Sequence, residues 1–174
     1  MRGPASAPWG GIAMIVYLLR HGKAEDGGPG MPDRDRQLTP EGVESMKEEL
    51  PGIKKNAPSL DLALTSPYPR AAQTARIVAQ AYGIEDRVEE TDALAAMDAE
   101  PEILKRIGKL PADSAVMCVG HSPLLGDLAA FLSGARDAYA LKKGGLAKIS
   151  FKGKPAERKG TFEWILKPKE LKQG

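Results

Sequence analysis

Short hydrophobic runs alternate along this chain with longer stretches in which apolar residues recur every three or four positions. The runs predict buried strands, and two later segments alternate between polar and apolar residues, as half-buried strands do. The predicted strands cover residues 15–19, 60–64, 87–90, 115–119, 146–151 and 161–166. Because strands and helices alternate, the sequence predicts an α/β three-layer sandwich with helices on both faces of the sheet. The central sheet is expected to be mostly parallel, with an antiparallel edge formed by the last two strands.

Four helices are expected between these strands, and capping residues mark their ends. The first begins at Pro40 behind the capping residue Thr39, and the Pro51-Gly52 pair is expected to end or kink it. Ser66 and Ser122 are expected to cap two later helices. The later helices are expected over residues 71–82, 101–107 and 123–132.

The 174 residues, of which 42% are hydrophobic and 28% charged, have the composition of one globular domain. We expect that domain to span residues 14–168, between a disordered tail over residues 1–13 and a C-terminal tail over residues 169–174. Met14, like Met1, is a candidate start of translation.

Charge, hydropathy and cysteine content bear on the partners and the location of the protein. The net charge is +2 and no long basic block occurs, so nucleic acid is not expected as a ligand. No apolar run approaches the roughly 20 residues of a membrane helix, and residues 1–13 lack the apolar core of an export signal. The one cysteine, Cys118, lies in an apolar run and is expected to be a buried core residue. Without a disulfide framework, a cytoplasmic location is expected.

Basic residues follow three of the predicted strands. Arg20 and His21 follow the first strand, Arg70 falls in the first turn of the helix after the second, and His121 follows the strand over residues 115–119. In an open α/β sheet these junctions lie at the same edge, where such folds bind ligands. Taken singly, each residue also has a structural explanation, as a hydrogen-bonding histidine or a solvated arginine. Together they predict an anion site, because clustered cationic groups are unfavourable without an anion.

Four sequence blocks resemble a known family. Residues 18–22 (LLRHG), 66–74 (SPYPRAAQT) and 120–125 (GHSPLL) resemble the three signature blocks of the histidine phosphatase superfamily, in its phosphoglycerate-mutase-like branch. Residues 36–42 (RQLTPEG) and the short length resemble the SixA-like phosphohistidine phosphatases. The resemblance extends over residues 15–166, nearly the whole predicted domain.

This resemblance implies a metal-independent phosphatase that works through a covalent intermediate. Neutral His21 would attack phosphorus in line, and water would then cleave the phosphohistidine that forms. Arg20, Arg70 and a protonated His121 would bind the phosphoryl oxygens. No metal and no cofactor is required by this chemistry.

The sequence departs from the family pattern at the proton donor. Larger members carry a glutamate after the third strand, but residues 92–100 show no such motif. Asp98 and Glu100 are candidate donors by position only, and each can equally be a solvated carboxylate. Arg36 is a candidate residue at the rim of the site, with a surface ion pair to Asp33 or Asp35 as the alternative.

A missing acid fits a phosphoramidate substrate, because imidazole leaves phosphorus more readily than an alkoxide does. The expected substrate is therefore phosphohistidine on a protein, for instance a histidine phosphotransfer domain. Two alternatives stay open: a phosphatase for small phosphomonoesters or nucleotides, and a non-catalytic phosphate- or phosphoprotein-binding module. No oligomeric state is predicted.

Overall fold

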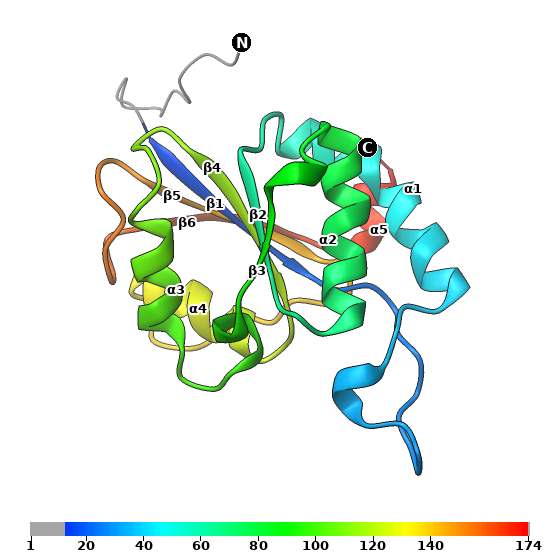
Figure 1. Cartoon of the computed structure of the whole chain (residues 1–174). Helices are drawn as coiled ribbons and strands as arrows, with labels where there is room; N and C mark the ends of the chain where they lie inside the picture. Colours follow the sequence, from blue (N-terminus) through cyan, green and yellow to red (C-terminus); the bar gives the residue numbers. More distant parts are fainter. Residues whose placement is uncertain (1–12, 174) are drawn as a thin grey trace.

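A six-stranded mixed sheet forms the centre of the protein in a computed structural model that describes residues 13–173 (Figure 1). The strand order is β3-β2-β4-β1-β5-β6. The strands are β1 (Met14–Arg20), β2 (Leu62–Thr65), β3 (Val88–Glu90), β4 (Ala115–Gly120), β5 (Leu146–Phe151) and β6 (Thr161–Leu166). All six predicted strands are present, and β2 begins two residues later than expected. The prediction of a disordered segment over residues 1–13 lies, apart from Ala13, outside the described residues.

The sheet is parallel on one side and antiparallel on the other. The pairs β3–β2, β2–β4 and β4–β1 are parallel. The pairs β1–β5 and β5–β6 are antiparallel. The predicted α/β sandwich with an antiparallel edge is thereby confirmed. Because β1, β2 and β4 are parallel, their carboxyl ends meet at one edge of the sheet.

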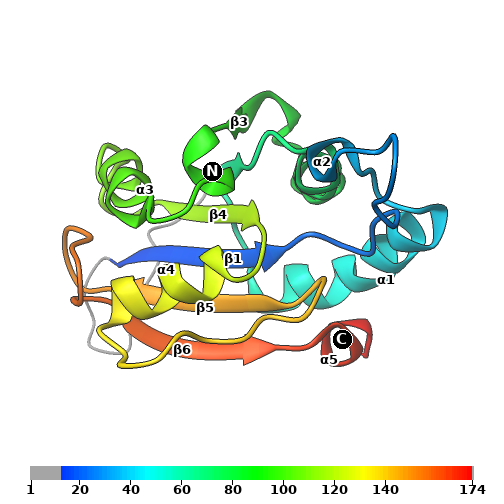
Figure 2. The same ribbon diagram turned by 90° about the horizontal axis from the view of Figure 1, so that it is seen from below.

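Within the described residues, five α-helices cover the two faces of this sheet. They are α1 (Pro40–Asn56), α2 (Pro69–Tyr82), α3 (Glu100–Ile107), α4 (Leu124–Ser133) and α5 (Pro168–Lys172). Three 3-10 turns join them, namely η1 (Asp33–Asp35), η2 (Glu85–Arg87) and η3 (Asp92–Ala95). α1, α2 and α5 group on one side and α3 and α4 on the other (Figure 1). Figure 2 shows α4 lying along β1, β5 and β6.

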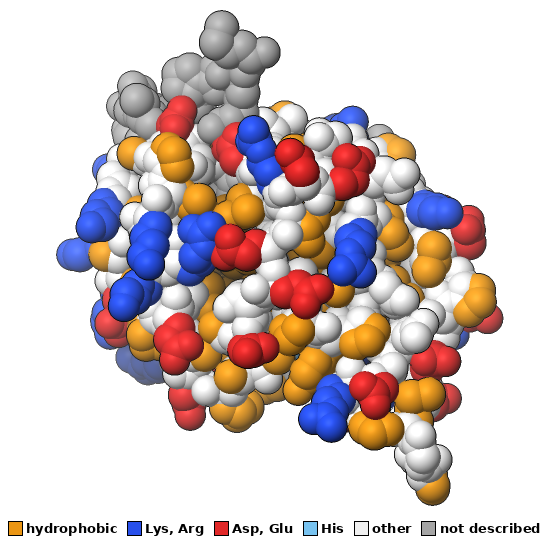
Figure 3. Space-filling model, in the orientation of Figure 1, with side chains coloured by type: hydrophobic (Ala, Val, Ile, Leu, Met, Phe, Trp, Pro, Cys, Tyr) orange, Lys and Arg blue, Asp and Glu red, His pale blue; other side chains and the backbone are white. Residues whose placement is uncertain are grey.

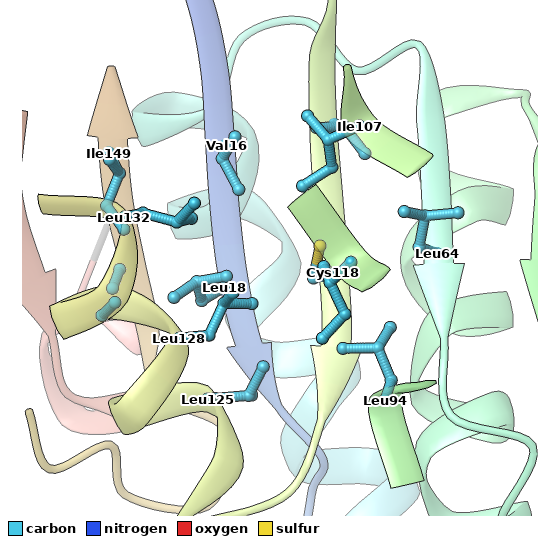
Figure 4. Close-up of a cluster of buried hydrophobic side chains, with 14 of the residues drawn as sticks. Val16, Leu18, Leu64, Leu94, Ile107, Cys118, Leu125, Leu128, Leu132 and Ile149 are labelled. Carbon is cyan, nitrogen blue, oxygen red and sulfur yellow. The ribbon is translucent and has the colours of Figure 1, made fainter. Parts of the chain in front are cut away.

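The period-two pattern of β1 divides its side chains between two cores. Val16 and Leu18 point to the α3 and α4 side, whereas Tyr17 and Leu19 point to the α1 and α2 side, and all four are buried. Figure 4 shows Val16 and Leu18 facing the leucines of α4. A strand covered on both faces must be apolar at every position, which accounts for the continuous hydrophobic run.

The Pro51-Gly52 pair does not end the first helix, and the C-terminal residues form a helix that was not expected, because the two helices pack together. α1 continues through Pro51 to Asn56, since a proline removes only one helical hydrogen bond and the following turn is held by burial of Ile53. Gly52 lets α5 approach α1 so closely that an added Cβ would collide with the carbonyl of Leu171. Residues 169–172, expected to be part of a tail, instead belong to α5 and bury Leu171 against α1.

The two serine caps were also predicted wrongly. α2 begins at Pro69 with Tyr68 as its N-cap, and α4 begins at Leu124 with Pro123 as its N-cap. Ser66 instead accepts a hydrogen bond from the backbone of Tyr68 at 3.1 Å and turns its hydroxyl toward the sheet edge. Thr39, in contrast, caps α1 as expected, through the backbone N–H of Gly42.

The surface in Figure 3 mixes acidic and basic side chains, in keeping with the net charge of +2. Within residues 13–173, no helix has the length and apolar character needed to cross a membrane.

Candidate active site

The carboxyl ends of β1, β2 and β4 are joined by backbone hydrogen bonds that fix the chain as it leaves the sheet. The N–H of His21 donates to the carbonyl of Gly120 at 3.0 Å, and the N–H of Ser66 donates to the carbonyl of Val119 at 3.0 Å. Arg20 lies beside Gly120 in the parallel register. The segments that carry His21, Ser66 and His121 are therefore neighbours, as the parallel topology predicts.

His21 is almost fully buried at this edge, with 4% of its surface exposed. Its Nδ1 lies 2.7 Å from the carbonyl oxygen of Gly22. A carbonyl can only accept, so Nδ1 carries the ring proton and Nε2 presents its lone pair. Nε2 accepts a 3.3 Å hydrogen bond from Nε of Arg70. The imidazole is thus held in the tautomer that a nucleophile needs.

The pKa of His21 is lowered to about 3, and burial is the largest cause. The neighbouring His121 and the positive charges of Arg70 and Arg20 also contribute to this lowering, whereas the hydrogen bond to Gly22 opposes it. His21 is therefore neutral at pH 7, and no proton occupies the lone pair of its Nε2.

Arg70 lies in the first turn of α2, where backbone N–H groups also favour an anion. Arg70 is buried, and only 7% of its side-chain surface is exposed. Nη1 donates to the carbonyl of Asp33 at 2.7 Å, and Nη2 donates to Oδ2 of Asp33 at 3.1 Å. With the bond to His21, three of the five N–H donors of the guanidinium are engaged, which leaves two for a ligand.

Two buried polar atoms around His21 have no hydrogen-bond partner among the described residues. They are Nε of Arg20 and Nδ1 of His121. Arg20 is anchored by Nη1, which donates to the carbonyl of Leu141 at 2.9 Å, and Nε2 of His121 is hydrogen-bonded to Oγ of Ser66 at 2.8 Å. A buried polar atom without a partner is unfavourable, so this edge is suited to a ligand that offers hydrogen-bonding atoms.

His121 lies beside the nucleophile candidate, with 5.1 Å between its ring centroid and that of His21. Its pKa is lowered to about 4, chiefly by burial, with smaller contributions from Arg70 and Arg20, while Asp33 opposes the lowering. A bound anion would act in the opposite direction and favour the imidazolium. Tyr68 packs between His121 and Arg70, 5.1 Å from the histidine ring and 5.3 Å from the guanidinium carbon.

A cleft of about 240 Å³ opens over this edge. Its lining residues are Asp33, Tyr68, Arg70, Leu94, Ala95, Ala96, Met97, His121, Ser122, Pro123 and Leu124. One wall is therefore charged and aromatic, whereas the opposite wall, from η3 and the loop behind it, is apolar.

The structure brings the four predicted basic residues, Arg20, His21, Arg70 and His121, to one place. Among the described residues, neither of the two predicted proton donors, Asp98 and Glu100, lines the cleft, and His21 and Arg20 lie behind its lining as well. Asp98 is exposed, and Glu100 is the first residue of α3.

Arg36 makes the ion pair that the sequence offered as the alternative to a role at the rim. Its Nη1 lies 2.8 Å from Oδ1 of Asp33, and its Nε donates to the carbonyl of Glu25. Since the other carboxylate oxygen of Asp33 contacts Arg70, Arg36 is joined to the cleft through Asp33.

Within residues 13–173, no group of three or more histidine, cysteine, aspartate or glutamate side chains has an arrangement that could hold a metal ion.

Sequence reasoning missed three side chains that support the site. Asp33 anchors Arg70, and Ser66 contacts His121. Thr74 accepts from the N–H of Gly22 at 3.2 Å and donates to the carbonyl of Arg70 at 2.7 Å. Ser66 and Thr74 lie in the signature-like block 66–74, which could have suggested both, but no local pattern indicates Asp33.

Comparisons with known proteins identify the family of this chain. Residues 16–106 match the sequence profile of the histidine phosphatase superfamily, branch 1. Over 155 residues the chain is 28% identical to a phosphohistidine phosphatase SixA homolog of Haemophilus influenzae, which covers 83% of this chain and 92% of the relative.

Solved structures extend the likeness to nearly the whole chain. A structure of the protein histidine phosphatase SixA complexed with tungstate superposes with a TM-score of 0.80 at 24% identity, covering 91% of this chain and 99% of that one. The putative phosphohistidine phosphatase SixA of Agrobacterium tumefaciens superposes with a TM-score of 0.71 at 23% identity, covering 87% and 96%. These structures share the fold, and the family profile spans more than half of the sequence. The chain therefore belongs to branch 1 of the histidine phosphatase superfamily.

Proposed function

We propose that this phosphatase removes the phosphoryl group from phosphohistidine on a protein, with His21 as the nucleophile. The observation that carries the proposal is the fixed tautomer of His21. Its Nδ1 proton is held by the carbonyl of Gly22, so its Nε2 lone pair faces the donors of the cleft. A neutral, buried imidazole surrounded by cationic groups suits attack on a phosphoryl group better than proton transfer, because such groups keep it unprotonated.

The remaining basic residues stabilise the negative charge of the phosphoryl group during its transfer. Arg70 has two N–H donors available, and Arg20 has an unpaired Nε. In the transition state of phosphoryl transfer, charge lies on three equatorial oxygens, and fixed guanidinium groups stabilise it without reorganisation. Binding of the substrate favours protonation of His121, which then adds a third cationic donor.

The reaction proceeds in two displacements. Nε2 of His21 forms a bond to phosphorus while the substrate imidazole leaves with the electron pair of the broken N–P bond. Water then attacks phosphorus, the pair returns to Nε2 of His21, and phosphate carries away the added hydroxyl. The second proton of that water goes to solvent or to the phosphate.

Phosphohistidine is the favoured substrate class because no neutral carboxyl group is found among the described residues that line the cleft. Asp98 and Glu100 do not line the cleft. An alkoxide leaving group must take up a proton as it leaves, whereas an imidazole whose second ring nitrogen is protonated leaves as a neutral molecule. The relative from Haemophilus influenzae carries the name of a phosphohistidine phosphatase, and tungstate, found in the SixA structure, is a tetrahedral oxyanion like phosphate. Both support the assignment.

The proposed partner is a phosphorylated protein, for instance a histidine phosphotransfer domain in the cytoplasm. The cleft holds only about 240 Å³, and its wall from Leu94 to Met97 is apolar. A side chain that projects from another protein can reach such a site, whereas a small sugar phosphate makes few contacts in it.

The test is phosphate release in excess chelator from a phosphotransfer domain phosphorylated on histidine, and from a set of phosphomonoesters. The wild type is expected to act fastest on the phosphohistidine, and mass spectrometry of quenched reactions is expected to find the phosphoryl group on His21. H21A is expected to lose at least about a thousandfold in kcat, because it removes the nucleophile.

The matched pair R70A and R34A distinguishes loss of an arginine in the cleft from loss of a positive charge on the surface. Arg34 is an exposed arginine of η1, so R34A is expected to retain turnover while R70A loses it. Faster release from monoesters would refute the substrate assignment, and phosphorylation of a residue other than His21 would refute the mechanism. If the wild type releases no phosphate from any substrate, the chain is instead a phosphate-binding module.

A further inference from the structure

Among the described residues that line the cleft, Asp33 is the only one with a carboxyl group. Two guanidinium groups fix it there: Oδ2 accepts from Nη2 of Arg70 at 3.1 Å, and Oδ1 accepts from Nη1 of Arg36 at 2.8 Å. Its side chain is nevertheless 66% exposed, and each carboxylate oxygen can accept a further hydrogen bond. Asp33 is thus both positioned and accessible.

Arg70 determines where Asp33 lies relative to the reaction. The Nε end of its guanidinium faces Nε2 of His21, and the Nη end faces Asp33. A phosphoryl group bound along this guanidinium has His21 on one side and Asp33 toward the other. Attacking and leaving atoms lie roughly in line in phosphoryl transfer, so the leaving group points to the Asp33 side.

The leaving group of a phosphohistidine has a specific requirement. When the N–P bond breaks, its electron pair goes to the ring nitrogen that held phosphorus. If the other ring nitrogen carries a proton, a neutral imidazole leaves. If it does not, the ring must leave as an imidazolate anion, which is a much poorer leaving group. An acceptor beside that second nitrogen therefore favours cleavage, because it keeps the proton in place.

His21 illustrates the same arrangement within the protein. Its Nδ1 proton is held by the carbonyl of Gly22 at 2.7 Å. Once Nε2 carries the phosphoryl group, this bond keeps the second nitrogen protonated, so that His21 can leave as neutral imidazole when water attacks. The substrate imidazole needs an equivalent acceptor in the first displacement.

We propose that the carboxylate of Asp33 accepts a hydrogen bond from the protonated second nitrogen of the substrate phosphohistidine and thereby selects phosphoramidate over phosphomonoester substrates. This inference rests on the proposed function. Asp33 acts as a specificity-determining residue that contacts the leaving ring, and no proton leaves or enters the carboxylate in the step.

The charges around Asp33 suit an acceptor and do not suit an acid. The hydrogen bond from Arg36 and that from Arg70 lower the pKa of Asp33, against the opposing effect of burial. The third titratable group that faces it, His121, is neutral at pH 7 before an anion binds. Asp33 is therefore ionised at neutral pH. It can hold a proton on imidazole, but it cannot supply one to an alkoxide.

The test compares D33N with wild type on free Nε2-phosphohistidine and on p-nitrophenyl phosphate, whose phenolate leaves without a proton. A charge-assisted hydrogen bond at an exposed site is lost in the variant, so the ratio of the two kcat/KM values is expected to fall about tenfold. The alkaline limit of phosphohistidine cleavage is expected to move down by about one pH unit, because the substrate ring loses its proton more readily without the carboxylate.

D35N is the matched control, since Asp35 is an exposed aspartate of the same 3-10 turn. It is expected to leave the ratio and the alkaline limit as in wild type. Equal losses of D33N on both substrates would overturn this inference, because Asp33 would then only position Arg70. Failure of the wild type to cleave phosphohistidine would instead overturn the proposed function itself, so the two failures are distinguishable.

Discussion

Glu49 is a buried carboxyl group whose ionisation should destabilise the protein. It lies on α1 with 1% of its surface exposed, and its Oε2 has no hydrogen-bond partner among the described residues. Burial raises its pKa from 4.5 to about 8, against the opposing effect of Lys172. The carboxyl lies so close to Gly144 that a Cβ there would overlap Oε1. The N–H of Gly144 in turn donates to the carbonyls of Arg20 and His21 at 2.9 and 3.1 Å.

The sign of the pH dependence follows from this raised pKa. Below pH 4.5 the Glu49 carboxyl is protonated in both the folded and the unfolded state, so pH has no effect through this group. Between pH 4.5 and about 8 only the unfolded state ionises, and the free energy of unfolding falls by up to about 1.4 kcal/mol per pH unit. Summed over this pH range, the loss in the free energy of unfolding has an upper bound of about 5 kcal/mol. Because helices relax and water penetrates, we expect Glu49 to lower the free energy of unfolding by about 3 kcal/mol at pH 9.

The perturbation is E49Q, which has the shape of the protonated carboxyl and no charge at any pH. Urea unfolding followed by circular dichroism is expected to give stabilities for E49Q and wild type that differ by less than about 1 kcal/mol at pH 5. At pH 9 the variant is expected to be more stable by about 3 kcal/mol, which moves the urea midpoint up by about 1.5 M. Other ionisable groups are common to both proteins, so their contributions cancel.

The control is E48Q, because Glu48 is the adjacent, exposed carboxylate, 3.8 Å from Lys172. Removing a surface ion pair changes stability by less than about 1 kcal/mol, with little dependence on pH. A stability difference between E49Q and wild type that stays constant from pH 5 to 9 would refute the reasoning, since it would show that Glu49 is ionised in the folded protein throughout.

Two further predictions concern packing. G42A is expected to destabilise the protein by about 3 kcal/mol, since the added Cβ would collide with the carbonyl oxygen of Lys23. G153A, with nothing within 4 Å of the added atom, is expected to melt within a few degrees of wild type; equal melting temperatures for both variants would contradict the prediction. Cys118 is fully buried, and burial raises its pKa to about 12, so an aromatic disulfide reagent is expected to modify it only as fast as the protein unfolds. Modification at the rate of a free thiol would show that the strand opens locally.

The strands and the four basic residues could be predicted because their signals are local. An apolar run such as that of β1 must be covered on both faces, and the polar residue that ends it marks the edge of the sheet. Parallel pairing then brings Arg20, His21 and His121 together without further information. The same rule placed Arg70, because a helix follows directly after β2.

The errors arise where distant parts of the chain decide the outcome. Pro51 does not end α1, because the turn that follows it is held by packing against α5, more than a hundred residues later. Ser66 is a good helix cap by composition, but its hydroxyl contacts His121, which lies on another strand end. Asp33 could not be found because nothing in its own neighbourhood indicates that the loop after β1 folds back onto α2.

One hydroxyl shows why the protonation state of His21 depends on α2 as much as on β1. Thr74 accepts from the N–H of Gly22 at 3.2 Å and donates to the carbonyl of Arg70 at 2.7 Å. The peptide whose carbonyl holds the Nδ1 proton of His21 belongs to Gly22, and the guanidinium that faces Nε2 belongs to Arg70. Thr74 therefore connects the peptide that fixes the tautomer with the guanidinium that faces the lone pair of His21. A strand end can supply a histidine, but the orientation of this histidine also depends on a contact across 52 residues.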